Sequence, residues 1–179
     1  LMSARLANQK ALEYGEHDIA LISFKDTRFG AWSQVQLLGA QAGVDTFRVN
    51  SDDALEQLVA ELSSRKLVLI DTPGVDVAST MNTLTALLPN AKYHLVVSAD
   101  ASEGGISKYI KMNNGAWTSI MLSRLANDIQ PWPLINVLLK ENIAVSLAAG
   151  VASITDPAAS ISGVSLLKTS LSGLPLSFV

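Results

Sequence analysis

The chain has 179 residues, and its 13 basic and 16 acidic side chains, scattered along the sequence, give a formal net charge of -3. Nucleic acid is not an expected partner, because binding to a phosphate backbone needs a concentrated basic face. The sequence has no cysteine, which excludes disulfides, thiolate metal sites and cysteine nucleophiles and is consistent with the cytosol. The length is that of one domain with one core, so we expect residues 1–179 to fold as a single domain.

Short apolar runs alternate with amphipathic stretches along the chain. The apolar runs predict strands at Ile19–Ile22, Thr46–Val49, Leu67–Ile70, Leu95–Val97, Ile120–Leu122 and Ile143–Leu147. Helical spacing predicts helices at Val35–Ala42, Leu55–Leu62, Ala78–Leu88, Ile106–Asn113 and Leu134–Glu141. Ser51 is the expected N-cap of the second helix, and Gly43 is the expected end of the first. This alternation is typical of an α/β fold, a mainly parallel doubly wound sheet with helices on both faces.

The last stretch of the chain, residues 158–179, is rich in Ser and Leu and has Lys168 as its single charged residue. Val164, Leu167 and Leu171 share one face of a predicted helix, which Gly173 and Pro175 should end. We expect this tail either to pack on the sheet or to dock on a partner, and the sequence leaves its role open.

The predicted strand Leu67–Ile70 ends on Asp71-Thr72-Pro73-Gly74, which brings a carboxylate, a hydroxyl and a flexible backbone amide to one place. Open α/β sheets bind ligands at the carboxyl ends of their strands. An acid there commonly holds a magnesium ion, and a glycine just beyond it can approach a terminal phosphate. The motif therefore predicts a nucleotide site with Asp71 as its metal residue, although an ordinary turn needs the same residue types.

A second motif, Lys25-Asp26-Thr27-Arg28-Phe29-Gly30-Ala31 with Gln34 behind it, lies between the first predicted strand and an amphipathic helix. A further predicted strand and helix follow this motif, and after them comes the strand that ends at Asp71. The order resembles the GTPase domain of signal-recognition-particle (SRP) type proteins, and most closely the flagellar FlhF-like family. That family has Asp-Thr-Tyr-Arg, then Ile-Gly-Ala and Gln-Leu, at the position of the Lys25 motif, and Asp-Thr-Ala-Gly-Arg at the position of the Asp71 motif.

The resemblance extends over roughly residues 1–157. Ser123-Arg124-Leu125-Ala126 stands where the family has Thr-Lys-Leu-Asp, which reads the guanine base. Ala149-Gly150-Val151, with Ile154 to Pro157 after it, looks like the family's last loop, and Leu1 to Gly15 looks like the helix that follows its phosphate-binding loop. The order of these elements is the specific signal, because each motif alone is weak.

The resemblance implies a P-loop NTPase-like G domain that binds GTP and Mg²⁺. It implies that Asp71 and Gly74 approach the metal and the γ-phosphate, and that Arg28 and Gln34 lie near the nucleotide and at the dimer surface. The other residues that it assigns to nucleotide binding are Thr72, Ser123, Arg124 and Gly150. The implied partners are a second copy or a related SRP-type GTPase, together with membrane-associated proteins. The implied location is cytoplasmic, with a peripheral place at the inner face of the membrane left open.

The departures from the family pattern affect its chemistry. The sequence has no Gly-x-x-x-x-Gly-Lys-Ser/Thr loop and no strand before it, so we expect the natural chain to extend toward the N-terminus. Lys25 replaces a catalytic aspartate, Val75 an arginine, and Ala126 the acid that reads guanine. Asp26 is an imperfect substitute for the acid lost at Lys25, because neighbouring strand residues point to opposite faces unless the loop bulges. Lys25 could instead serve as a fixed cation beside phosphates.

Three functions therefore remain open. The first is a GTP-binding protein of flagellar targeting and assembly whose hydrolysis is reduced or lost. The second is a degenerate, non-enzymatic G domain that acts as a protein-interaction module. The third is a ParA- or MinD-like ATPase, which also ends a strand in Asp-x-Pro-Gly. Whether the chain is an enzyme stays open, because Lys25 and Ala126 occupy the positions of the catalytic and base-reading acids.

Overall fold

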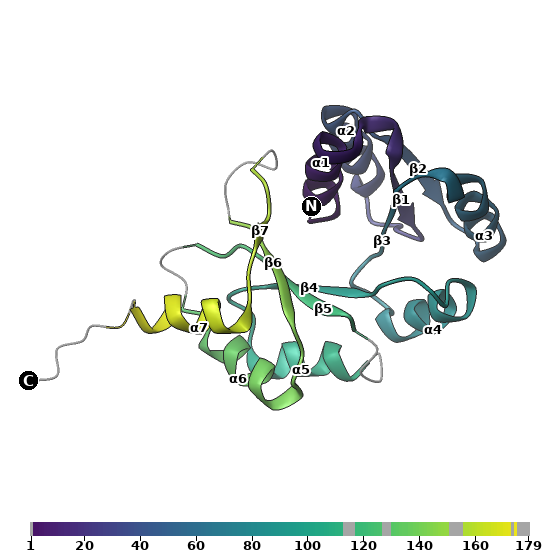
Figure 1. Ribbon diagram of the computed structural model, residues 1–179. Coiled ribbons are helices and arrows are strands. Elements are labelled where there is room, and N and C mark those ends of the chain that lie inside the picture. Colours follow the sequence, from purple (N-terminus) through teal and green to yellow (C-terminus); the bar gives the residue numbers. More distant parts are fainter. Residues whose placement is uncertain (1, 113–116, 127–129, 151–155, 173, 175–179) are drawn as a thin grey trace, which may run out of the picture. The chain divides into compact units, whose positions relative to one another are not determined.

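The computed structural model describes residues 2–112, 117–126, 130–150, 156–172 and 174 (Figure 1). The chain divides into two compact units, which are described separately below. Unit 1 comprises residues 1–91 and 153–157, and unit 2 comprises residues 92–152 and 158–179. Several residues of the predicted elements lie outside the described residues, namely Asn113, Val151, Ile154, Gly173 and Pro175.

Unit 1 contains a three-stranded parallel sheet in the order β2-β1-β3. Its strands are β1 (Ile19–Phe24), β2 (Asp45–Val49) and β3 (Leu67–Asp71). Its helices are α1 (Met2–Tyr14), α2 (Ala31–Ala42), α3 (Asp52–Glu61) and α4 (Val77–Leu87), with short 3₁₀ turns at Glu16–Asp18 and Leu62–Ser64. Each predicted strand and helix of this unit is confirmed to within a few residues at its ends.

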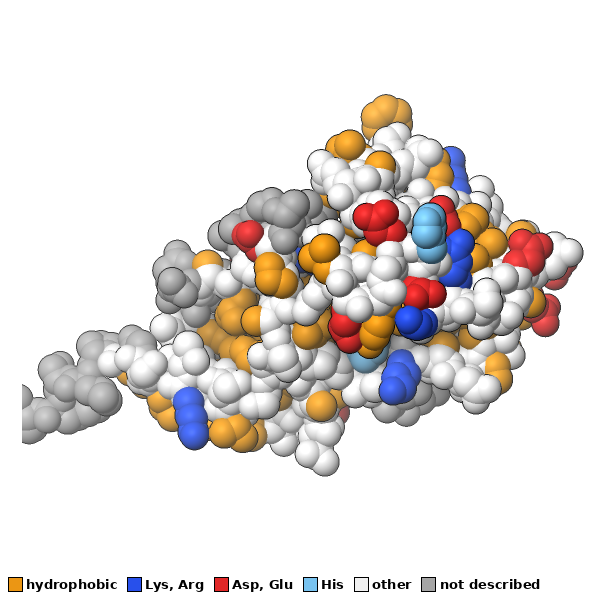
Figure 2. Space-filling model, turned by 45° about the horizontal axis from the view of Figure 1, so that its top comes forward, with side chains coloured by type: hydrophobic (Ala, Val, Ile, Leu, Met, Phe, Trp, Pro, Cys, Tyr) orange, Lys and Arg blue, Asp and Glu red, His pale blue; other side chains and the backbone are white. Residues whose placement is uncertain are grey.

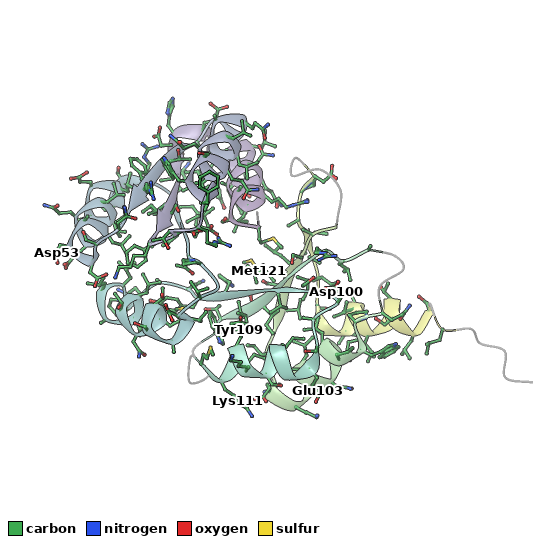
Figure 3. The ribbon with its side chains drawn as sticks, turned by 180° about the vertical axis from the view of Figure 1, so that it is seen from behind. Asp53, Asp100, Glu103, Tyr109, Lys111 and Met121 are labelled. Carbon is green, nitrogen blue, oxygen red and sulfur yellow. The ribbon has the colours of Figure 1, made fainter. Side chains whose placement is uncertain are left out.

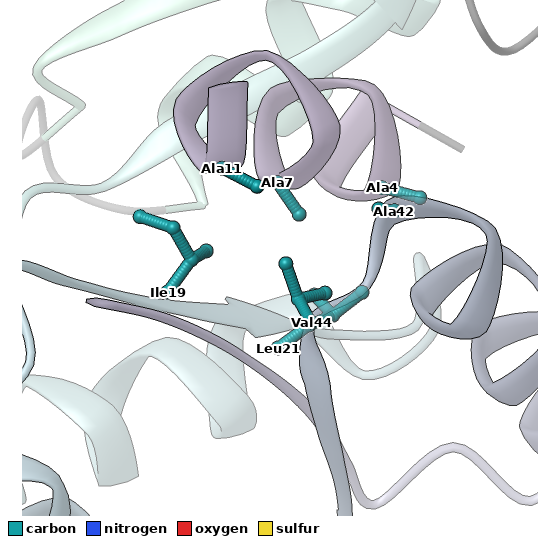
Figure 4. Close-up of a cluster of buried hydrophobic side chains, with 7 residues drawn as sticks. All are labelled: Ala4, Ala7, Ala11, Ile19, Leu21, Ala42 and Val44. Carbon is teal, nitrogen blue, oxygen red and sulfur yellow. The ribbon is translucent and has the colours of Figure 1, made fainter. Parts of the chain in front are cut away.

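The core of unit 1 lies between α1 and the central strand β1, all of whose residues are buried (Figure 4). Three small side chains of α1, Ala4, Ala7 and Ala11, allow the helix to lie close to Ile19 and Leu21 of β1. Burial of apolar surface between a helix and a sheet is the main favourable term in such a fold. This packing brings the first turn of α1 to the sheet.

Local signals position the ends of α2 and α3 as predicted. Gly43 takes a left-handed conformation, with a φ of 67°, and ends α2. The Ser51 side chain accepts a hydrogen bond from the Ala54 N–H at 3.4 Å and caps α3. At Gly39 a Cβ atom would lie 2.0 Å from Cγ2 of Thr46, so glycine permits the close approach of α2 to β2.

Unit 2 contains a four-stranded sheet in the order β4-β5-β6-β7. Its strands are β4 (His94–Ser98), β5 (Ser119–Ser123), β6 (Val145–Ala148) and β7 (Ala159–Ser160). The first three strands run parallel, and β7 pairs antiparallel with β6. Its helices are α5 (Glu103–Lys111), α6 (Trp132–Glu141) and α7 (Gly163–Ser172). Parallel strands separated by helices confirm the predicted α/β class in this unit as well.

The tail forms the helix that the sequence predicts, and its buried side chains are not those of the apolar face named above. Leu166 and Ser170 of α7 are buried, whereas Val164 and Leu171 are exposed. The reason is that α7 packs on α6, and this contact selects a different face from the most apolar one. The tail also supplies β7, a strand too short to be recognised from its sequence.

The surface agrees with the scattered charges of the sequence. On the face shown in Figure 2, acidic and basic side chains are interspersed and no basic patch gathers. No helix among the described residues is long and apolar enough to cross a bilayer. The described ranges also contain no group of three or more His, Asp or Glu side chains able to hold a metal ion by themselves.

Candidate functional site

In unit 1 the candidate residues lie at the carboxyl end of the sheet β2-β1-β3. The parallel register places Ser23 of β1 opposite Arg48 on one side and Asp71 on the other. The Lys25 motif follows β1 directly and the Asp71 motif follows β3, so both leave the sheet at the same edge. This is the edge at which parallel α/β sheets bind ligands.

Lys25 turns away from the other candidate residues. Its backbone N–H donates to the Val49 carbonyl at 2.8 Å, which extends the pairing of β1 with β2 by one residue. Its φ of 52° is left-handed, and its ammonium lies 2.5 Å from Oδ1 of Asp52 in the first turn of α3. The ammonium also lies 5.0 Å from the centroid of the Phe24 ring. The positive charge that replaces the family's acid is therefore paired locally.

Asp26, the next residue, is buried and binds Arg28. Oδ1 of Asp26 accepts from Nε of Arg28 at 2.9 Å and from the Arg28 backbone N–H at 3.1 Å, and Oδ2 accepts from Nη2 at 2.5 Å. These hydrogen bonds from Arg28 lower the pKa of Asp26, and in return they raise the pKa of Arg28. The left-handed turn at Lys25 interrupts the alternation of the strand. It is the kind of irregularity that lets Asp26 point inward.

Asp71 lies at the same edge of the sheet and contacts α1. Its Oδ1 accepts from Oγ of Ser3 at 2.8 Å, which joins the end of β3 to the first turn of α1. The Asp71 carboxylate also helps to raise the pKa of Arg28, which places its negative charge within the electrostatic range of the guanidinium. The motifs of Asp71 and Arg28, which the sequence assigned to one nucleotide site, thus leave the sheet of unit 1 at the same edge.

The remaining candidates of unit 1 are open to solvent or half-buried. Thr72 is half-buried and Gly74 is exposed, and nothing would lie within 4 Å of a Cβ atom at Gly74. Gln34 is exposed in the first turn of α2, where its backbone N–H donates to the Gly30 carbonyl at 3.0 Å. Gly74 and Gln34 are both exposed residues, which leaves them accessible to a ligand.

In unit 2 the carboxyl ends of β4, β5 and β6 bring together the other candidates. Ser123 lies opposite Ser98, and its Oγ donates to the Val97 carbonyl at 3.1 Å. Arg124 follows with a left-handed φ of 57°, and its Nη2 lies 3.6 Å from Oδ2 of Asp100. A Cβ atom at Gly150 would lie 3.5 Å from the Leu125 carbonyl oxygen, so the last loop lies beside the segment after β5.

The Arg124–Asp100 pair is the main electrostatic feature of this edge. Asp100, labelled in Figure 3, accepts a hydrogen bond from Ser98 Oγ, and this bond together with the charge of Arg124 lowers the pKa of Asp100. Ala126 is half-buried and offers no side-chain acceptor. The edge therefore holds a cation that could stack on a base, but its acid stands on the neighbouring strand end rather than in the base-reading position.

Sequence reasoning missed two residues that contact the candidates. Ser3 binds Asp71, and only its place in the first turn of a helix resembling the one after a phosphate-binding loop hinted at such a contact. Asp52 binds Lys25, but in the sequence it reads simply as an acid at a helix N-terminus. Both contacts join residues far apart in the sequence.

Comparisons with known proteins find similarity in part of the sequence and in the fold. No protein-family model matches the chain. Over 100 residues the chain is 34% identical to the flagellar biosynthesis protein FlhF of Pseudomonas aeruginosa, a match that covers 53% of this chain and 23% of that protein. The chain thus spans less than a quarter of the length of this relative.

Two solved structures share the fold. A crystal structure of FlhF complexed with GMPPNP and Mg²⁺ matches with a TM-score of 0.76 at 17% identity, over 94% of this chain and 68% of that one. A structure of chloroplast FtsY from Physcomitrella patens matches with a TM-score of 0.72 at 17% identity, over 94% of this chain and 60% of that one.

Proposed function

Because this chain is an FlhF-like domain with the fold of the SRP-type GTPases, we propose that it binds GTP and Mg²⁺ at the carboxyl ends of its strands. The observation that carries the proposal is the joint placement of Arg28 and Asp71 at one edge of unit 1, where a cation for phosphate lies near an acid for a metal. We place the domain in a protein of flagellar targeting and assembly.

The residues of unit 1 fit a magnesium ion and a triphosphate. Asp71 and the Ser3 hydroxyl offer the oxygen ligands that Mg²⁺ prefers, directly or through water. When bound, the ion would neutralise charge on the phosphate oxygens. Arg28 would contact a phosphate, and the exposed Gly74 amide could approach its terminal oxygens. The Lys25 ammonium, paired with Asp52, does not have to lie against the ion.

The sequence contains no Gly-x-x-x-x-Gly-Lys-Ser/Thr motif, so residues 1–179 offer no loop of this type to the phosphates. The sheet of unit 1 has one feature that bears on the site. Among the described residues β3 pairs only with β1, although its apolar sequence is that of an interior strand.

We propose that hydrolysis is reduced or lost in this domain. The family's catalytic acid is replaced by Lys25, and Asp26, the next residue in the chain, is engaged by Arg28 and so is not free to accept a proton from water. Val75, which replaces an arginine, is exposed and brings no charge. Discrimination for guanine is weakened as well, because Ala126 cannot accept the hydrogen bonds that identify this base.

The second candidate function is a non-enzymatic protein-interaction module. Phe29, within the Lys25 motif, is fully exposed, and the exposed Val75 follows the Asp71 motif. Apolar side chains in these places suit contact with a protein, either a second copy of the chain, a related SRP-type GTPase or a membrane-associated partner. A ParA- or MinD-like ATPase ranks last, because the comparisons found FlhF and FtsY.

Calorimetric titration of the full-length protein with GTP and with ATP, with and without Mg²⁺, tests the proposal. We expect GTP to bind in a Mg²⁺-dependent manner with a weak preference over ATP, and turnover to be slow. Binding of neither nucleotide would favour the interaction module, and binding of ATP alone would favour the ATPase. Tight binding with strong guanine preference and rapid turnover would overturn the proposed loss of catalysis.

A further inference from the structure

We propose that Asp26 is a positioning residue, whose buried carboxylate holds the Arg28 guanidinium in one orientation for contact with a phosphate. This inference rests on the proposed function, because it concerns the same triphosphate site. At the position of Asp26 the family pattern has the threonine of Asp-Thr-Tyr-Arg and no acid. The proposed role of Asp26 is therefore not part of the family pattern.

The geometry joins a buried acid to an exposed base. The Asp26 side chain is 3% exposed, whereas that of Arg28 is 61% exposed. Nε and Nη2 of Arg28 both donate to Asp26, and a guanidinium has further N–H donors on Nη1. One side of the guanidinium is therefore fixed against the protein, and the donors on the other side remain open to an anion.

The backbone fixes the same segment at both ends. The Arg28 backbone N–H donates to the Asp26 carboxylate at 3.1 Å, and the Arg28 carbonyl accepts from the Ala31 N–H at 3.2 Å at the start of α2. The arginine is thus anchored in backbone and side chain before a ligand arrives. An anchored side chain loses less conformational entropy on binding than a free one does, and this raises affinity.

Simple electrostatics predicts that Asp26 weakens phosphate binding, whereas a positioning role predicts that it strengthens it. The direction of the change in affinity therefore tests the inference. A carboxylate near a phosphate repels it, so neutralising an acid close to an anion site strengthens anion binding when the acid has no other role. If Asp26 positions Arg28, neutralising it weakens binding instead. The exposed Asp53 in the first turn of α3, labelled in Figure 3, offers a matched control with the same change of charge.

The first experiment titrates the wild-type protein, Asp26→Asn and Asp53→Asn with inorganic triphosphate and with GTP. We expect Asp26→Asn to weaken binding of both by about tenfold, and Asp53→Asn to leave binding unchanged or slightly tighter. Arg28→Ala and the double variant Asp26→Asn/Arg28→Ala should bind equally weakly, because Asp26 acts through Arg28. Binding by Asp26→Asn as tight as wild type, or additive losses in the double variant, would overturn the inference.

A second measurement needs no substitution and covers the case in which Asp26→Asn does not fold. In the NMR spectrum of the wild-type protein, the Arg28 Nε–H should exchange slowly and should keep its shift when triphosphate is added. An Arg28 signal that resembles those of free arginine side chains would overturn the inference while leaving the proposed function in place. Absence of triphosphate and GTP binding by the wild type would overturn the proposed function, and with it the role of Asp26.

Discussion

The arginines at the carboxyl ends of the two sheets differ in how firmly their side chains are held. In unit 1 Arg28 donates to a buried carboxylate with two side-chain nitrogens and its backbone N–H. In unit 2 Arg124 lies 3.6 Å from Asp100, and both of these side chains are largely exposed. A bidentate pair with a buried carboxylate fixes the arginine side chain, whereas an exposed pair at longer distance contributes little to stability and is screened by salt. The comparison indicates that the edge of unit 1 holds its arginine in one geometry, while the edge of unit 2 holds its arginine only loosely.

The largest effect is expected in the core beneath the first edge. Leu21→Ala removes a fully buried side chain of β1 and should lower the free energy of unfolding by about 2–5 kcal/mol. Leu12→Ala, in the exposed part of α1, is the control and should cost little. Chemical denaturation followed by circular dichroism measures both. A loss for Leu12→Ala as large as that for Leu21→Ala would contradict the packing of α1 on β1.

The next prediction separates the two edges by ligand. Arg28→Ala should weaken binding of inorganic triphosphate by about tenfold or more, because a charge-assisted hydrogen bond contributes ~1.5–3 kcal/mol. Arg124→Ala should leave triphosphate binding unchanged and weaken GTP binding by about threefold, through the loss of stacking on the base. Titration calorimetry with both ligands decides. An equal loss of triphosphate affinity in the two variants would remove the distinction between the edges.

A substitution at Ala126 tests whether the segment after β5 contacts the base. Ala126→Asp restores an acceptor after β5 and should raise the preference for GTP over ATP by about fivefold, ~1 kcal/mol, since Ala126 is only half-buried. Competition between fluorescent GTP and unlabelled nucleotides measures the ratio. Ala126→Asn, which also places a hydrogen-bonding side chain there but no charge, is the control. An unchanged ratio in Ala126→Asp would show that the base does not reach this segment.

The smallest effect concerns acid stability. The pKa of Asp26 is lowered in the folded protein, so its contribution to stability is present above the unfolded value of about 4 and is lost as the pH falls through the lower folded value. The melting temperature of the wild type should therefore fall more steeply on acidification than that of Asp26→Asn. Asp100→Asn should follow the wild type closely, because the Asp100 pair is exposed. Melting curves recorded between pH 3 and 6 measure these differences. A melting temperature of Asp26→Asn that falls as steeply as that of the wild type would contradict the prediction.

Local patterns in the sequence were sufficient for most helices and strands of the fold, although not for β7. Apolar runs located the strands, helical spacing located the helices, and Ser51 and Gly43 marked two helix ends, because these features depend on residues close together in the chain. The resemblance to FlhF-like proteins depended on the order of such elements. It was detectable although the phosphate-binding loop is absent from the sequence.

The partners of the side chains at the strand ends follow from the tertiary structure and not from local sequence. Lys25 binds Asp52 and Asp71 binds Ser3, contacts between residues that the chain folds together across the edge of a sheet. The inward turn of Asp26 follows from one left-handed residue at Lys25, a backbone conformation that no local pattern requires of lysine. The buried face of α7 likewise depends on α6, its neighbour. Local sequence thus specifies which residues form most elements and which motifs end the strands, and long-range packing specifies which of their side chains come into contact.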